Sequence, residues 1–490
     1  MMLLEFNINF YKIFNFFEYF IILYVGLIAV IYFLMMTLGY FGLRNYRARF
    51  KRDELEALLK SPLLPQVAIL APAYNEAATC RDSVRAMLKL HYPNHEVIVI
   101  NDGSKDDTLN ILIEEFRLYR SSRVASDAIV TKPIKAIYES RDPIRLVVID
   151  KENGGKADSL NAGLNVARAS LVCAVDADSL LESDALLLSV KPFLEEPDKT
   201  IAVGGTIRIA NGCSVEHGKI TRVVAPNSML AKFQAVEYMR AFLGGRVAFS
   251  FINALLIISG AFGVFRRDAM LAIGGFYPDT VGEDMELVVR LHRTWREMKK
   301  DYRIVFIPEP VCWTEVPEKL KILHRQRNRW QRGTVDSLWF HRKMMFNPKY
   351  GVIGTFAFPY FLMFEMFGPA VEATGYFLTV IGLFLNIISW KAAFLFFLVS
   401  VVFGILLSVS AFILEELTLR RYPTLKDASK LFIAAIIENF GFRQLMTLWR
   451  AEGLIDGIRR KQGWGAMERK GFQATQAIQQ PTAAPPNPLP

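Results

Sequence analysis

Short apolar runs alternate with amphipathic helical patterns in the segment that begins at Pro65. The runs are typical of buried strands and fall at residues 67–71, 96–100, 145–149 and 171–175. The segments near residues 77–90, 108–119 and 157–169 predict helices. Strand–helix alternation of this kind predicts an α/β fold whose mostly parallel sheet is covered by helices on both faces. The basic stretch from Arg117 to Arg145 interrupts the alternation, and we expect it to be a solvated excursion.

An uncharged apolar stretch near the start of the chain predicts a membrane helix. Residues 19–43 carry no charged side chain, and a helix of this length extends about 38 Å, enough to cross a bilayer. The stretch is too long for the core of a signal peptide, so we expect a retained anchor. Basic residues follow within residues 44–52, whereas Lys12 alone precedes it. The positive-inside rule places the N-terminus outside and the next domain in the cytoplasm of an inner-membrane, multi-pass protein.

Apolar stretches return in the C-terminal third of the chain, at residues 353–390, 392–414 and 431–448. The first is too long for one ordinary span, and the turn-like Gly368-Pro369 offers a point of division. Two crossings within this stretch would put the basic tail in the cytoplasm, as the positive-inside rule favours. The sequence does not decide whether the C-terminal part has two, three or four spans. Carboxylates are costly in lipid, so we expect three of them to line a protein interior or a polar passage: Glu365, Glu372 and Glu438.

The composition excludes some classes of function. The net charge is +10 and the hydrophobic fraction is 52%. Basic flanks that face anionic lipid account for this charge, and no nucleic-acid-binding motif accompanies it, so nucleic acid is not an expected partner. The four cysteines have neither metal nor disulfide spacing, which fits a reducing cytoplasm. His91 and His95 are spaced like a helical metal pair, but they flank a Tyr-Pro-Asn turn and are expected on the surface.

Two carboxylates follow the predicted strand at residues 171–175. Asp176 and Asp178 are two residues apart, which places both on one side of an extended chain. Their oxygens suit Mg²⁺ or Mn²⁺, and substrate phosphates usually complete the coordination of Mg²⁺ held by one or two carboxylates. The pattern therefore predicts a divalent cation and a diphosphate-bearing small molecule. Asp-x-Asp at a strand end is also typical of a turn or a helix cap, so the pair alone leaves this alternative open.

Polar residues also follow the other predicted strands. Ligands of mostly parallel sheets bind beyond the carboxyl ends of the strands, so these residues are expected to converge. Tyr74 is suited to stack on a base, Glu76 and Asp102 to accept hydrogen bonds from uracil or ribose, and Lys156 to neutralise phosphate. The alternatives are a simple turn at residues 102–104 and a glycine loop before a helix capped by Asp158 or Ser159.

Three later segments carry residues suited to chemistry. The small residues at 259–263 permit close approach of the backbone to a ligand. Gly282-Glu283-Asp284 opens a helix predicted at residues 285–293, where acidic residues also suit the helix dipole. The run from Gln326 to Trp330 fits either an interfacial basic helix with an aromatic anchor or an Arg and a Trp presented to a diphosphate and a sugar face.

Together these motifs resemble the membrane-embedded processive synthases of glycosyltransferase family 2, which include poly-N-acetylglucosamine, hyaluronan, chito-oligosaccharide and cellulose synthases. Six motifs occur in the family's order: residues 71–76, 102–104, 155–158, 176–178, 282–284 and 326–330. The resemblance implies a cytoplasmic GT-A domain inserted between an N-terminal transmembrane helix and a C-terminal group of transmembrane and interfacial helices. The expected units are an anchor with its basic flank (1–52), the catalytic domain (53–333), an interfacial helix (334–352), a membrane domain (353–450) and a basic, then disordered Pro-rich tail (451–490).

The resemblance also implies roles for individual residues. Those implied to hold uridine diphosphate are Pro72, Tyr74, Glu76, Asp102, Lys156 and Asp158. Asp176 is implied to contact the nucleotide sugar and, with Asp178, the metal, while Asp284 is implied as the general base. The residues implied to frame the leaving diphosphate and the acceptor end of the polymer are Gln326, Arg329 and Trp330, with the loop at 260–263 beside the acceptor.

The residue types agree with this chemistry, because a single displacement with one base inverts the anomeric centre and needs positive charge on the leaving phosphate. We therefore expect a processive inverting β-glycosyltransferase that polymerises a UDP-activated hexose, N-acetylglucosamine before glucose, and extrudes the exopolysaccharide through its own spans. Its partners are the UDP-sugar donor, the growing polysaccharide and the bilayer, and accessory export subunits stay open. The alternatives are a membrane transferase that adds one sugar to a lipid carrier and a non-enzymatic scaffold or transporter.

Overall fold

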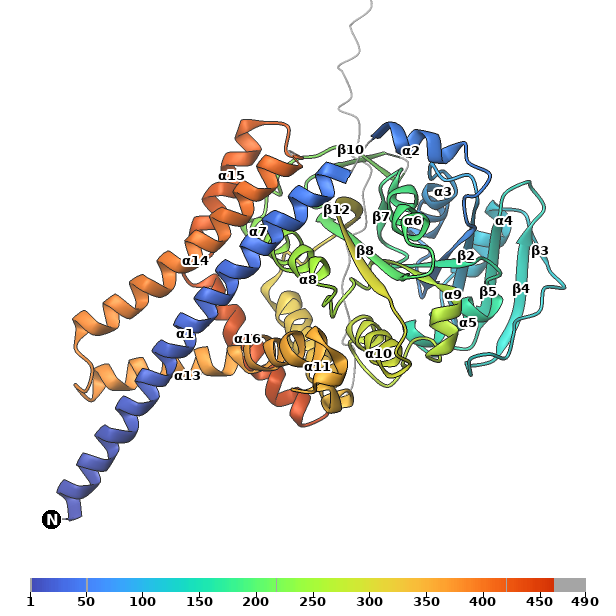
Figure 1. Cartoon of the computed structure of the whole chain (residues 1–490). Coiled ribbons are helices and arrows are strands. Elements are labelled where there is room, and N and C mark those ends of the chain that lie inside the picture. Colours follow the sequence, from blue (N-terminus) through green and yellow to red (C-terminus); the bar gives the residue numbers. More distant parts are fainter. Residues whose placement is uncertain (1, 50–51, 217, 420, 462–490) are drawn as a thin grey trace, which may run out of the picture.

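The computed structural model describes residues 2–49, 52–216, 218–419 and 421–461. Helix α1 (Met2–Arg49) leads into an α/β domain, and a group of helices follows that domain in the chain (Figure 1). The predicted disordered tail after Phe472 lies outside the described residues.

A mixed, mostly parallel ten-stranded sheet forms the centre of the domain, with the strand order β3-β4-β5-β2-β1-β6-β11-β8-β12-β7. Strands β1, β2, β5 and β6 run parallel, as do β8 and β12, and the other pairs are antiparallel. The strand bounds are β1 (Val67–Ala73), β2 (His95–Asp102), β5 (Leu146–Lys151), β6 (Leu171–Val175), β7 (Leu180–Leu181), β8 (Thr200–Ile209), β11 (Phe262–Arg266) and β12 (Arg303–Thr314). The four predicted strands are confirmed, because their apolar runs are buried as strands covered on both faces must be.

Helices connect and cover these strands. Helix α5 packs on β1 and β2, and α6 packs on β8 and β12. The helices of the domain are α2 (Arg52–Leu59), α3 (Cys80–Leu88), α4 (Thr108–Glu115), α5 (Lys156–Val166), α6 (Ala185–Glu195), α7 (Met229–Met239), η1 (Arg240–Arg246), α8 (Val247–Phe251), α9 (Arg267–Ala272) and α10 (Glu283–Glu297). A small two-stranded sheet of β9 (Ser214–Glu216) and β10 (Lys219–Arg222) precedes α7.

The expectation of a solvated excursion between Arg117 and Arg145 is wrong. Strands β3 (Leu118–Arg120) and β4 (Ile134–Ser140) pair there and extend the sheet at its edge, so the helix predicted to reach residue 119 ends at Glu115. Most side chains of β3 and β4 are exposed or partly exposed, and charges on an edge strand hide the apolar alternation while they protect the edge. The intervening loop is tied down by the buried pair of Arg123 and Glu96, at 3.2 Å.

Three helices of the described chain are long and apolar enough to cross a membrane: Tyr19–Ala48, Ile353–Phe384 and Ala393–Thr418. They belong to α1, to the run from η4 (Ile353–Ala357) through α12 (Phe358–Tyr360) and η5 (Phe361–Met366) to α13 (Gly368–Phe384), and to α14 (Trp390–Thr418). The predicted stretch at 353–390 therefore supplies one candidate span, although the chain does bend at Phe367, directly before Gly368. Helices α1 and α14 lie side by side along the diagonal of Figure 1.

The apolar stretch at residues 431–448, which Glu438 and Arg443 interrupt in the sequence, is bent in the structure. Helices α15 (Leu425–Ile437) and α16 (Phe442–Ile458) meet there at an angle of 62°, as in a broken span or a re-entrant loop. Gly441 lies in the break with a φ of 96°, a left-handed conformation that favours glycine. Helix α11 (Leu320–Phe340) also continues unbroken across the domain boundary expected at residue 333, before the short turns η2 (Arg342–Met344) and η3 (Pro348–Tyr350).

Buried ion pairs join the α/β domain to the C-terminal helices. Arg208 on β8 pairs with Glu415 on α14, and the two side chains are 5% and 0% exposed. Arg240 on η1 pairs with Glu438 at the end of α15, and the Ser408 hydroxyl also donates to Glu438. Because a buried charge needs its partner, these pairs fix where the helices sit against the sheet.

Replacing Arg208 by Met is expected to destabilise the protein by about 3–5 kcal/mol, because Glu415 is left as an uncompensated buried charge. Adding Glu415→Leu should restore most of that stability, since the double variant removes both charges. Thermal unfolding of the detergent-purified protein measures both effects. Arg303→Met is the matched control, because Arg303 and its partner Glu196 are 40% and 38% exposed; an equal loss there would contradict the prediction.

Candidate active site

A cavity of about 1330 Å³ lies where the α/β domain meets the C-terminal helices. The predicted residues that line it are Lys156, Asp176, Asp178, Asp284, Gln326, Arg329 and Trp330. The three carboxylates expected in a polar interior, Glu365, Glu372 and Glu438, line the same cavity, so that expectation is confirmed. One continuous space therefore connects the end of β6 with side chains on candidate membrane helices.

The Lys156 ammonium lies among the acidic residues of this cavity. Its Nζ is 2.6 Å from Asp176 Oδ1 and 3.4 Å from Glu283 Oε1, and it donates a hydrogen bond to the Gly260 carbonyl at 3.0 Å. Burial alone lowers the pKa of Lys156, but Asp176, Glu283 and Asp284 outweigh burial and raise this pKa above its ordinary value. Lys156 is thus a fixed positive charge at the point where an anionic ligand is expected.

Asp284 stands in the first turn of α10. Its Oδ2 accepts a hydrogen bond from the Gly260 backbone N–H at 3.2 Å, and its Oδ1 accepts one from Met285 N at 2.8 Å. A Cβ at position 260 would lie 3.0 Å from Lys156 Nζ and 3.6 Å from Asp284 Oδ2, so the backbone at Gly260 lies close to both side chains. The carboxylate thus faces the cavity with its orientation set by backbone donors.

The remaining predicted nucleotide residues lie next to the cavity and do not line it. Asp102 is buried, and its carboxylate accepts hydrogen bonds from Lys151 Nζ at 2.8 Å and from the backbone of Gly154 and Gly155 at 2.9 and 2.8 Å. Lys151 Nζ is also 2.6 Å from Asp158, which therefore pairs with a lysine instead of capping α5. These contacts hold the glycine loop that delivers Lys156.

Strand β1 presents the other three residues of this group. Pro72 and Ala73 belong to the strand itself, and Tyr74 follows with 45% of its surface exposed. Glu76 accepts a hydrogen bond from the Thr79 hydroxyl at 2.7 Å. Of these three side chains, Tyr74 is therefore the exposed one.

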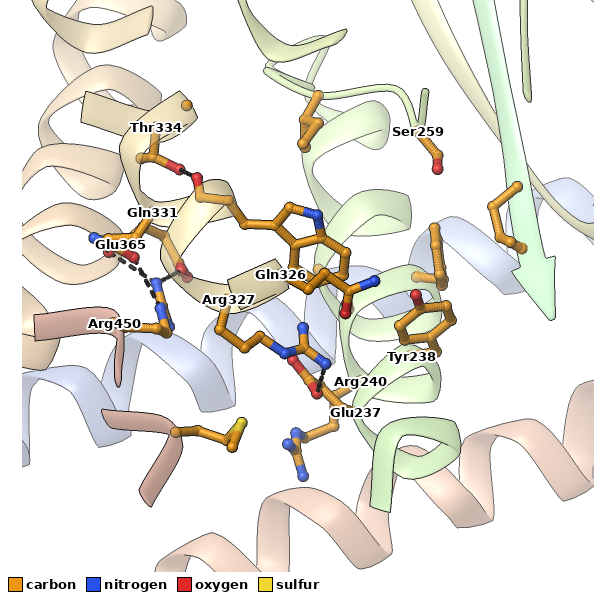
Figure 2. A pocket seen from close by; sticks show the side chains of 18 of the residues that line it. Glu237, Tyr238, Arg240, Ser259, Gln326, Arg327, Gln331, Thr334, Glu365 and Arg450 are labelled. Atoms are coloured by element: carbon orange, nitrogen blue, oxygen red, sulfur yellow. Dashed lines mark hydrogen bonds and ion pairs between the residues drawn. The ribbon is translucent and has the colours of Figure 1, made fainter. Parts of the chain in front are cut away.

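Helix α11 supplies the opposite wall of the cavity. Arg327 pairs with Glu237 of α7 at 2.8 Å, and its guanidinium lies 4.3 Å from the centre of the Trp330 ring (Figure 2). Gln326 Oε1 is buried without a hydrogen-bond partner among the described residues. Trp330 is 42% exposed and borders the cavity, so its ring offers a flat apolar surface there.

A family model described as "Glycosyltransferase like family 2" matches residues 65–333, and one described as "Chitin synthase" matches residues 280–462. The chain belongs to glycosyltransferase family 2. The first match covers the sheet and the part of α11 that lines the cavity, whereas the second runs from the start of α10 through the C-terminal helices.

Curated relatives are named poly-beta-1,6-N-acetyl-D-glucosamine synthases. One from Staphylococcus epidermidis is 31% identical over 273 residues, covering 56% of this chain and 55% of the relative. One from Staphylococcus aureus (strain COL) is 28% identical over 352 residues, covering 70% of each. The chain thus spans about half the length of the first of these relatives. Among solved structures, a mannosyltransferase from Pyrobaculum calidifontis in complex with GDP-Man and Mn²⁺ is 20% identical, with a TM-score of 0.48 over 85% of this chain and 99% of that one.

Sequence reasoning missed several residues of this glycosyltransferase site. Glu283 is buried beside Lys156; burial raises the pKa of Glu283, although Lys156 opposes that rise. Glu283 belongs to the motif at residues 282–284, but no role was predicted for it. Glu237 and Arg246 line the cavity from α7 and η1, which carry no motif of the family set. Only the Gly-Gly-Arg at residues 244–246 signalled an unusual backbone there.

Two glycines bring the start of α10 and helix α11 into backbone contact. A Cβ on Gly333 of α11 would lie 2.8 Å from the Gly282 Cα, and a Cβ on Gly282 would lie 2.6 Å from the Gly333 Cα. His341 Nε2, 3.1 Å from Glu286 Oε1, supports the same helix pair farther along. The distance from Asp284 to the α11 wall therefore depends on the absence of side chains at 282 and 333.

Gly333→Ala is expected to lower transfer by at least about tenfold, because the added methyl group pushes α10 away from α11 and shifts the base from the acceptor. The KM for the nucleotide sugar should rise as well, since Glu283 follows Gly282 directly and lies 3.4 Å from Lys156 Nζ. Gly26→Ala is the matched control, a helical glycine whose added Cβ meets nothing within 4 Å. Equal turnover of the Gly333 variant and wild type would show that this contact does not set the geometry.

Proposed function

We propose that this protein is a processive, inverting β-glycosyltransferase that polymerises a UDP-activated hexose and extrudes the polymer across the membrane. The observation that carries the proposal is the single cavity that joins Asp176, Asp178 and Asp284 to carboxylates of the C-terminal helices. N-acetylglucosamine is the favoured sugar, since the relatives are named for its β-1,6 polymer, and glucose comes next.

The donor end is proposed to bind uridine diphosphate in the manner of a GT-A domain. Tyr74 offers its exposed ring to the base, while Asp102 and Asp158 act by holding the glycine loop through Lys151. Lys156 then faces the phosphates. The resemblance implied that six residues contact uridine diphosphate directly. We propose an indirect role for Asp102, because its carboxylate already accepts several hydrogen bonds within the protein.

Asp176 and Asp178 fit a Mg²⁺ or Mn²⁺ ion. No group of three or more His, Cys, Asp or Glu that could hold a metal occurs among the described residues, so the protein offers these two carboxylates and leaves other positions to the diphosphate. This is the usual manner in which Mg²⁺ is bound with phosphate substrates. When bound, the ion neutralises the charge that develops on the leaving diphosphate.

The chain's own groups account for the remaining steps. Asp284 accepts the proton of the acceptor hydroxyl, whose oxygen bonds to the anomeric carbon as the bond to the diphosphate breaks. Arg329 and Lys156, both in the cavity wall, add positive charge on the diphosphate side. A single displacement converts an α-linked donor into a β-linked product.

The membrane side of the cavity is suited to an oligosaccharide. Arg450 donates to Glu365 Oε2 at 2.9 Å, and Thr447 donates to Glu372 Oε2 at 3.0 Å (Figure 2 shows the Arg450 contacts). These polar groups satisfy one another and still border the cavity, as sugar hydroxyls require of a path through apolar helices. We propose that the polymer leaves along this path, with the catalytic domain in the cytoplasm and the N-terminus outside.

We propose that each of the three candidate spans crosses the membrane once. If α15 and α16 form a re-entrant pair, the segment after α16 returns to the cytoplasm, as its basic residues favour. We propose this arrangement in place of a second crossing within residues 353–390.

Asp284→Asn is expected to lower UDP release at least about a hundredfold, because the amide cannot accept the hydroxyl proton. UDP binding should persist, since the donor side is untouched. Release of UDP from UDP-N-acetylglucosamine by the purified full chain, with UDP affinity from calorimetry, measures both. Turnover equal to wild type would remove Asp284 from the mechanism.

Removing divalent cations with EDTA should abolish transfer, and Mn²⁺ or Mg²⁺ should restore it, because two carboxylates and a diphosphate repel one another without a cation. Asp178→Asn should raise the Mn²⁺ concentration needed for half-maximal rate. A rate unaffected by EDTA would contradict the cation site.

The polymer itself distinguishes processive synthesis from the addition of one sugar to a lipid carrier. Mass analysis of the product made from a panel of UDP-sugars should show long chains at low donor conversion. Single additions to lipid would favour the transfer to a carrier, and the absence of UDP release would favour a scaffold.

A further inference from the structure

Arg246 closes the π-helical segment η1 and borders the active-site cavity. Segments with this geometry are rare and often mark functional sites. Here the adjoining Gly244 packs against α1: a Cβ on Gly39 would lie 3.0 Å from the Gly244 carbonyl oxygen. The backbone that carries Arg246 is therefore held between the first candidate span and the cavity.

The Arg246 guanidinium has no ion pair or hydrogen bond from any described residue. Its Cζ lies 4.1 Å from the centre of the Phe242 ring, and its Nη1 is buried without a partner. Burial lowers the pKa of Arg246 to about 10, against the weaker opposing effects of Asp284 and Tyr238. The group is still charged at neutral pH, so the fold keeps a partly buried cation whose Nη1 has no hydrogen-bond partner among the described residues.

Three other arginines of the same cavity are paired. Arg327 bonds to Glu237, Arg450 to Glu365 and Arg240 to Glu438. The fold thus places a carboxylate against each of these three arginines, but none of the described carboxylates pairs with Arg246. An unsatisfied buried charge in such a place is typical of a group whose partner is a ligand.

Arg246 borders the same cavity as Asp284, and the Asp284 carboxylate opposes the lowering of the Arg246 pKa by burial. Gln326 Oε1, a buried acceptor without a described partner, borders the same cavity. A sugar carries hydroxyls that both accept and donate and can therefore satisfy either group, whereas a phosphate only accepts at neutral pH and cannot donate to Gln326 Oε1.

We propose that Arg246 binds an oxygen of the acceptor's terminal sugar, a hydroxyl or an acetamido carbonyl, and holds that sugar beside Asp284. This assignment rests on the proposed transferase function and adds to it an acceptor-binding residue outside the family motifs. The sugar oxygen accepts the hydrogen bond for which Arg246 Nη1 has no acceptor in the fold. Part of the binding energy therefore comes from this new hydrogen bond to a charged group.

Arg246→Met tests the assignment in the purified full chain, with a tetrasaccharide of N-acetylglucosamine as acceptor and UDP-N-acetylglucosamine as donor. The KM for the tetrasaccharide should rise about ten- to hundredfold, as expected for a lost hydrogen bond to a charged group. The KM for the donor should change by less than about twofold. Arg246→Lys, which keeps a charged donor, should recover part of the acceptor affinity.

Thermal unfolding separates binding from a structural role. Because Arg246 has no partner in the fold, Arg246→Met should melt at the wild-type temperature or above it. Arg303→Met, an arginine in an exposed pair on β12, is the control and should alter neither KM.

A raised donor KM with an unchanged acceptor KM would overturn the assignment and point to the diphosphate. Unchanged values for both, or a lowered melting temperature with both KM values unchanged, would also overturn it. Calorimetric binding of the tetrasaccharide to wild type and to Arg246→Met covers the case in which wild type transfers no sugar. Transfer failure then counts against the proposed function, whereas equal tetrasaccharide binding, or none to either protein, counts against Arg246.

Discussion

The attraction between Lys156 and the carboxylates around it is the interaction on which the catalytic site depends. The ammonium joins Asp176 at the end of β6, Glu283 at the start of α10 and the Gly260 carbonyl before β11. Without this charge, three carboxylates in one half-buried space would repel one another and pull the elements apart. A bound cation and diphosphate would enter an environment whose positive and negative charges are already arranged for them.

A second constraint comes from charges placed among apolar helices. Glu365, Glu415 and Glu438 each face an arginine, and two of those arginines belong to β8 and η1 of the α/β domain. Each pair is strong only in one relative position of sheet and helices, so the pairs align the cavity across the boundary between the two parts of the chain. The proposed path for the polymer is a consequence of that alignment.

Arg246 differs from these paired arginines because its Nη1 is buried without a partner among the described residues, and it borders the same cavity as the proposed base. A chain that compensates its other buried charges gains nothing in stability from one left unpaired. Such local costs are expected where binding or catalysis uses the unsatisfied group. The unpaired Arg246 Nη1 thus helps to identify the part of the cavity that we propose binds the acceptor.

The sequence by itself determined the buried parallel strands, the long apolar helices and the identity of the acidic and basic motif residues, because hydrophobic periodicity and residue type are local properties. It failed at β3 and β4, whose exposed, charged side chains resemble a loop, and it left open how the helices now seen as α15 and α16 are arranged. The ligand roles that the resemblance implies for Asp102 and Asp158 stay predictions, while the structure adds that both carboxylates pair with Lys151. Only the tertiary structure decided these pairings, the contact of Gly282 with Gly333 and the isolation of Arg246, because each depends on distances between segments far apart in the chain.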